Sequence, residues 1–98
     1  MSAKRIWKYI LQITDEQIIE VPSGAKLLHI DQQEGRLCLW MIVDIESELT
    51  KFVVNIVGTG NPVPNELPPY IGTAQIHTLV WHVFAGEFRA RLEGKSND

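Results

Sequence analysis

The segment Gly58-Thr59-Gly60-Asn61 carries residue types that are suited to holding an anion. Its glycines allow the backbone to approach a ligand closely, and successive N–H groups can surround a phosphate. The Thr59 hydroxyl and the Asn61 amide add further polar contacts. Neither a lysine nor a helix signal follows, so the Walker and dinucleotide-binding fingerprints are both absent. The alternative is that the two glycines form a bulge or a sharp turn where the chain leaves a sheet.

Aromatic and basic residues elsewhere in the chain complete the predicted ligand site. Trp40, Trp81 and Tyr70 would stack on a nucleobase. Arg36 and Arg89 would neutralise the charge of the phosphates. The alternative is that each tryptophan belongs to the core and that each arginine is a solvated surface residue.

The remaining polar residues do not form a pattern that is typical of catalysis or metal binding. His29, His77 and His82 stand on different predicted strands, and their spacing does not match a zinc site. No nucleophile elbow and no catalytic carboxylate pair is present. We therefore predict no enzyme activity, no metal and no cofactor. The carboxylates stand mostly in predicted turns, where charges are usually solvated: Asp15, Glu16, Glu20, Asp31, Glu34, Asp44, Glu46 and Glu48.

The segment 58–69 is unusually long and stiff for a connection in a chain of 98 residues. It contains four prolines, whose fixed φ angles lower the entropy that is lost when a ligand orders the segment. We expect it to be a preformed rim for a ligand. The alternative is an arm that lies along a neighbouring subunit.

Alternation of side chains predicts the strands of the first half of the chain. Residues 4–13 alternate with a period of two, and a short strand over 17–21 ends at Pro22; a helix over 14–20 is the alternative. Two apolar runs flank Gly35, whose positive φ suits a short hairpin loop. The second run, 37–43, is apolar on both faces, so it is either covered on both sides or meets another subunit.

The second half adds predicted strands over 51–58, 70–76 and 78–84, with a tight turn near His77 and Thr78. We therefore expect one all-β domain over residues 1–98: a small antiparallel sandwich or partly open barrel of six or seven strands. A short C-terminal helical turn or tail follows, and residues 92–98 are expected to be disordered.

Composition narrows the function classes. The net charge of −3 and a pI near 5.5 argue against a binder of long nucleic acids, which normally shows a basic stripe. The longest run without a charged residue, 52–65, contains glycine and proline, so we predict no membrane span. Cys38 is the single cysteine and stands in an apolar strand. The chain is therefore expected to reside in a cytosol.

Five motifs taken in order resemble a family of small proteins encoded by tailed bacteriophages. The motifs are "IWKY" at 6–9, "LWMIVD" at 39–44, "GTGNP" at 58–62, "YIGT" at 70–73 and "LVWHVF" at 79–84. The resemblance implies a viral origin and a β-rich fold, and it provides no catalytic residues.

A viral origin suggests a role against host defence, by analogy with phage proteins that sequester the cyclic nucleotide signals of CBASS immunity. The predicted function is a non-catalytic oligomeric sponge, a dimer or tetramer, that binds a small anionic signal such as the cyclic dinucleotide 3′3′-cGAMP in the cytoplasm of the infected bacterial host. The alternatives are a protein–protein inhibitor of a host defence enzyme and a structural protein of the virion or of its assembly.

Overall fold

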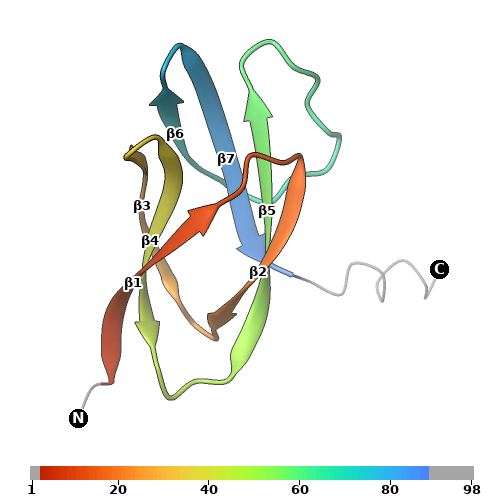
Figure 1. Ribbon diagram of the computed structural model, residues 1–98. Helices are drawn as coiled ribbons and strands as arrows, with labels where there is room; N and C mark the ends of the chain where they lie inside the picture. The colour runs from red at the N-terminus through yellow and green to blue at the C-terminus, as the bar shows by residue number, and fades with distance from the viewer. Residues whose placement is uncertain (1–2, 89–98) are drawn as a thin grey trace, which may run out of the picture.

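The computed structural model describes residues 3–88, which form two antiparallel sheets that do not close into a barrel (Figure 1). Sheet A has the strand order β1-β4-β3, and sheet B has the order β2-β5-β7-β6. The prediction of an all-β antiparallel domain is confirmed. The seven strands are β1 (Lys4–Leu11), β2 (Glu16–Pro22), β3 (Lys26–Gln33), β4 (Arg36–Asp44), β5 (Leu49–Gly58), β6 (Tyr70–Ile76) and β7 (Leu79–Glu87).

In sheet A, the apolar strand β4 lies between two partners. It forms a hairpin with β3 and pairs on its other edge with β1, so that Lys8 and His29 both stand opposite Trp40. The hairpin turn places Glu34 at φ 54° and Gly35 at φ 79°. Two successive positive φ angles are the signature of a type I′ turn, whose twist matches that of the strands. The predicted hairpin is therefore present.

In sheet B, β5 is the longest strand and pairs with β2 and β7. The tight turn expected near His77 and Thr78 joins β6 to β7, and His77 adopts a φ of 57°. Strand β7 continues to Glu87, three residues beyond the predicted strand. These last residues pair with β5, where Glu87 stands opposite Phe52.

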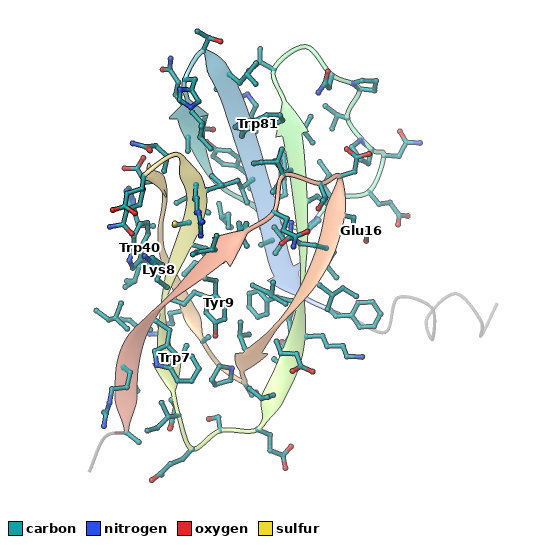
Figure 2. The ribbon with its side chains drawn as sticks, viewed as in Figure 1. Trp7, Lys8, Tyr9, Glu16, Trp40 and Trp81 are labelled. Carbon is teal, nitrogen blue, oxygen red and sulfur yellow. The ribbon has the colours of Figure 1, made fainter. Side chains whose placement is uncertain are left out.

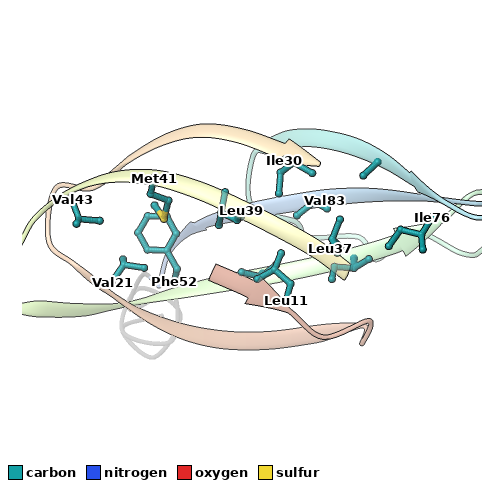
Figure 3. Packing of buried hydrophobic residues seen from close by; sticks show 14 residues of the cluster. Leu11, Val21, Ile30, Leu37, Leu39, Met41, Val43, Phe52, Ile76 and Val83 are labelled. Carbon is teal, nitrogen blue, oxygen red and sulfur yellow. The ribbon is translucent and has the colours of Figure 1, made fainter. Parts of the chain in front are cut away.

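The core lies between the two sheets (Figure 3). Strand β4 places every second side chain there, because residues that alternate along a strand point to the same face of the sheet. Leu37, Leu39, Met41 and Val43 are each at most 1% exposed. The inner faces of β5 and β7 pack against them through Phe52, Val54, Ile56, Val83 and Ala85.

The two sheets approach each other most closely where β3 meets β6. A Cβ atom built on Gly72 would lie 2.8 Å from the Cβ atom of Ile30. Any larger residue at position 72 would therefore push the strands apart. The pairing of β6 with β7 is irregular at this point, between Tyr70 and Gly72.

The predicted C-terminal helical turn and the predicted disordered tail lie outside the described residues. Within residues 3–88, the structure contains no helix that is long and apolar enough to span a membrane.

Candidate binding groove

The chain leaves β5 through a sharp turn, in agreement with the alternative interpretation of the two glycines. The Asn61 N–H donates a hydrogen bond to the Gly58 carbonyl at 3.0 Å, and Gly60 adopts a φ of +94°. A Cβ atom at Gly58 would lie 2.9 Å from Asn61 Nδ2 and 3.0 Å from the Trp81 ring. Gly58 is therefore required by close packing and Gly60 by backbone conformation.

The segment that follows, residues 59–69, is called the proline loop; it connects β5 to β6 (Figure 1). Its far end is fixed to β7, because the Ala85 N–H donates to the Pro69 carbonyl at 2.9 Å. A Cβ atom at Gly86 would lie 3.1 Å from Pro69 Cδ and 3.3 Å from Pro68 Cβ. The loop is thus held against sheet B at both ends.

A groove of about 870 Å³ lies between the proline loop and the outer face of sheet B. We call it the acidic groove. Its apolar lining comes from β5, from the end of β7 and from the loop itself: Val53, Ile56, Val57, Pro62, Val63, Pro64, Leu67, Pro68, Pro69, Gly86 and Phe88. Its polar lining consists of Asp15, Glu16, Asn55, Asn61, Glu66 and Glu87.

Two hydrogen bonds to the Asp15 carbonyl position the carboxylates at the start of β2. The Asp15 carbonyl accepts hydrogen bonds from Asn55 Nδ2 at 3.1 Å and from the Ile56 N–H at 3.2 Å. These bonds tie the connection between β1 and β2 to the middle of β5. Glu16 follows directly and stands opposite Asn55 in the pairing of β2 with β5. Asn55, the polar residue in the middle of an apolar strand, therefore anchors one wall of the groove.

The acidic groove has a strongly one-sided charge. Four carboxylates line it, and among the described residues that line it there is no lysine, arginine or histidine. Carboxylates clustered around a low-dielectric concave surface concentrate a negative potential there. The groove therefore favours a cation over an anion.

A separate polar feature lies on the outer face of sheet B, outside the groove lining. His82 Nε2 lies 2.8 Å from Thr59 Oγ1, and His82 Nδ1 lies 3.0 Å from Thr73 Oγ1. Thr73 Oγ1 in turn lies 2.5 Å from the Tyr70 hydroxyl. We call these four residues the hydroxyl–imidazole chain. A neutral imidazole donates at one nitrogen and accepts at the other, so the two threonine hydroxyls have different roles.

The structure brings some of the predicted site residues together and separates others. Gly58, Thr59, Gly60 and Asn61 form one turn, and the hydroxyl–imidazole chain links Thr59 to Tyr70. Trp81 is partly buried and packs against the core.

Trp40 and Arg36 belong to β4 in the other sheet (Figure 2). Arg89 lies outside the described residues. Within one copy of the described chain, Trp40 and Arg36 therefore do not share a site with the turn formed by residues 58–61.

Sequence reasoning missed the carboxylates of the groove. Asp15 and Glu16 are exposed, as expected of solvated carboxylates, but they also line the groove together with Glu66 and Glu87. Two features of the sequence point toward such a groove: the acidic pI, and a stiff proline loop that can pack against a neighbouring surface. Among residues 3–88, no group of three or more histidine, cysteine, aspartate or glutamate side chains is arranged to hold a metal ion.

Comparison with known proteins gives one family. No curated protein and no solved structure matches the chain. A family model matches residues 2–93, which is nearly the whole sequence. The chain therefore belongs to the family described as domain of unknown function DUF7352.

Proposed function

We propose that this protein is a non-catalytic binding protein that holds a short, basic segment of a partner protein in the acidic groove. The observation that carries the proposal is the groove wall, where four carboxylates surround an apolar floor. This proposal develops the protein–protein alternative of the sequence analysis.

Lysine and arginine fit both parts of this wall. Their aliphatic stems pack on apolar surface while their charged heads stay near solvent, where they can meet carboxylates. The groove volume of about 870 Å³ is within the usual range of ligand sites. It therefore admits a few side chains of an extended segment.

The proline loop supports a binding role through preorganisation. Its prolines restrict the backbone, and the contact of Pro69 with Ala85 fixes its far end. A partner that enters the groove then orders less chain and loses less entropy, which leaves more of the contact energy as affinity.

A direct test uses a short fluorescent peptide of alternating arginine and valine residues, with binding followed by anisotropy. We expect it to bind, and to bind more weakly as salt is added, because exposed charge pairs are screened. The variant Asp15→Asn/Glu16→Gln/Glu87→Gln removes three carboxylates. At about 0.5 kcal/mol for each exposed pair, the affinity should fall about tenfold.

The matched control is Glu20→Gln, which removes a carboxylate from β2 outside the groove lining. It should leave the affinity unchanged. The proposal fails if a peptide of alternating glutamate and valine binds equally well, or if the triple variant binds like the unaltered protein.

A second candidate is sequestration of a cyclic dinucleotide such as 3′3′-cGAMP, as an anti-CBASS immune-evasion protein of a phage. The hydroxyl–imidazole chain favours it, because three hydroxyls and an imidazole beside the Gly60 turn can bind phosphate oxygens. The resemblance to phage proteins supports a location in the cytoplasm of the infected host. Trp40 and Arg36 would have to come from a second subunit.

Calorimetric titration with the 3′3′ and 2′3′ cyclic dinucleotides distinguishes this candidate from the first. Binding that is lost in His82→Ala but kept in the triple carboxylate variant would favour the dinucleotide. The absence of heat with all of these nucleotides, together with binding of the arginine–valine peptide, would favour the groove.

A further inference from the structure

Sheet A carries exposed isoleucines among charged and polar residues on the side away from the core. We call it the sheet A face, and it consists of Lys4, Ile6, Lys8 and Ile10 of β1, of Arg36, Cys38, Trp40, Ile42 and Asp44 of β4, and of Lys26, His29, Asp31 and Gln33 of β3. Ile6 is 63% exposed and Ile10 is 49% exposed. Isoleucine side chains on the outside of a sheet lose a favourable burial energy unless another surface covers them.

We propose that the sheet A face binds a second copy of this chain in a two-fold symmetric dimer, with the two faces packed against each other. In such a dimer one surface must be complementary to itself. The strand register shows how the sheet A face meets this requirement. This inference is independent of the acidic groove, which lies on the other sheet.

The middle row of the face contains Lys8, Trp40 and His29, which pair across the three strands. A two-fold axis that passes along this row, perpendicular to the strands, places each strand over its own copy in the reverse direction. The row of Ile6, Ile42 and Lys26 then covers the row of Ile10, Cys38 and Asp31.

The contacts that result are complementary in character. Ile6 meets Ile10 along β1, and Ile42 of β4 meets the surface around Cys38, whose own side chain is only 1% exposed, so the contacts between these two rows are mainly apolar. Lys26 meets Asp31 at the β3 side, with opposite charges. One row further out, Arg36 meets Asp44, again with opposite charges. Opposite charges at matching positions fix the register of an interface more than they add affinity.

The other two-fold arrangement, with the axis along β4, is much less favourable. In this arrangement each row of one copy faces the same row of the other, and β1 lies over β3 of the second copy. Ile10 then meets Asp31, and Ile6 meets Lys26. Each of these contacts buries a charge against an isoleucine of the second copy, which places no opposite charge against it. The distribution of charge therefore selects the first arrangement. On either side of the Trp40 row, each of these charged residues has one of opposite sign at the matching position. This pattern is expected if the partner is a second copy of the chain, and it has no explanation if the partner has an unrelated sequence.

Lys8 carries the charge that needs to adapt, because the axis brings each residue of the middle row, Lys8, Trp40 and His29, near its own copy. Its Nζ donates to Gln33 Oε1 at 2.6 Å, and β1 is an edge strand. A lysine at an edge can extend its stem along the interface and keep its charge in water. The bond to Gln33 then has to open, and the like charges of the two lysines meet at the solvated edge of β1.

The test is analytical ultracentrifugation of the full chain over a range of concentrations. We expect a monomer–dimer equilibrium. The variant Ile6→Glu/Ile10→Glu should weaken dimerisation at least tenfold, because four carboxylates would enter the apolar contact between the two β1 strands. The matched control is Ile18→Glu, which is 52% exposed on sheet B and should leave the equilibrium unchanged.

A charge exchange tests the arrangement itself. Lys26→Asp alone should weaken the dimer, since two aspartates would then face each other, and Lys26→Asp/Asp31→Lys should restore it. Far-UV circular dichroism and the urea midpoint verify that each variant is folded. A chain that stays monomeric at all concentrations would overturn the proposal. So would a dimer that is unaffected by Ile6→Glu/Ile10→Glu, or a charge exchange that restores nothing.

Discussion

Tyr9 illustrates how a single polar atom affects this small core. The residue packs against the core cluster, and its hydroxyl is buried without a hydrogen-bond partner among the residues that the structure describes. A buried polar group that lacks a partner lowers the free energy of unfolding. Burial also raises the pKa of the Tyr9 hydroxyl above its usual value of 10.0, because the apolar surroundings disfavour the charged form.

Tyr9→Phe should therefore increase the free energy of unfolding at neutral pH, by up to about 1 kcal/mol. The difference should change further in alkali. Above a pH of about 10 the unfolded tyrosine loses its proton while the folded one keeps it, so the stability of the unaltered protein falls as the pH rises. The phenylalanine variant lacks this loss.

Urea denaturation at about pH 8 and about pH 10.5 measures both effects. Tyr70→Phe is the control, because the Tyr70 side chain is 58% exposed and its hydroxyl is bonded to Thr73. It should bring no gain in stability. A Tyr9→Phe variant that is less stable than the unaltered protein would show that the hydroxyl has a partner in solution, such as a water molecule.

Among the elements, the proline loop depends on one contact with β7. Pro68 and Pro69 lie over Gly86, and the Ala85 N–H is bonded to the Pro69 carbonyl. Gly86→Val should lift the loop from the sheet, because the added side chain would occupy the place of the two proline rings. The core residues of β7 would stay where they are.

Hydrogen exchange followed by NMR gives the measurement. The amide of Ala85 should exchange faster in Gly86→Val. The exchange rate of the Val83 amide, two residues earlier in β7, should not change. The affinity of the acidic groove for the arginine–valine peptide should fall in parallel. Equal protection of Ala85 in both proteins would mean that the loop tolerates the larger side chain.

The strands themselves were predictable because their signals are local. The alternation over 4–13 and the positive φ at Gly35 depend only on neighbouring residues; residues 4–11 of the first form β1, and the second appears as predicted. The acidic groove depends on contacts between distant residues. Asp15 lines it because Asn55, 40 residues away in the sequence, binds its carbonyl. No local pattern contains that information.

At the scale of the whole molecule, the order of the strands in the two sheets could not be predicted from the sequence either. The sequence does not indicate that β1 pairs with β4 or that β2 crosses to the other sheet. This crossing is the reason why Trp40 and Trp81, which were predicted to share a site, lie on different sheets (Figure 2). Both tryptophans stand on strands, as expected; only the pairing of strands decides which side chains meet.

The junction of the two sheets gives a prediction for the stability of the whole domain. Gly72→Ala would place its methyl carbon 2.8 Å from the Cβ atom of Ile30. Both atoms are attached to strand backbone, so neither can move aside easily. Overpacking of this kind typically costs about 1–3 kcal/mol. A domain of this size has a free energy of unfolding of only about 5–15 kcal/mol, so the urea midpoint should drop clearly.

Gly86→Ala is the matched control, since its closest neighbours are proline rings of a loop, at 3.1 and 3.3 Å. The loop can give way by a few tenths of an ångström, so the loss of stability should be smaller than for Gly72→Ala. Equal losses for the two variants would mean that β3 and β6 separate easily, and that the sheets are held together by the core alone.

The Lys8–Gln33 bond has a practical consequence for thiol chemistry. It spans β4 diagonally at the level of Cys38, whose side chain is only 1% exposed although it belongs to the outer face of its sheet. A maleimide or disulfide reagent can reach this sulfur only when the side chains around it move aside. The sequence contains no other cysteine, so the labelling rate reports the opening of this one place in the molecule.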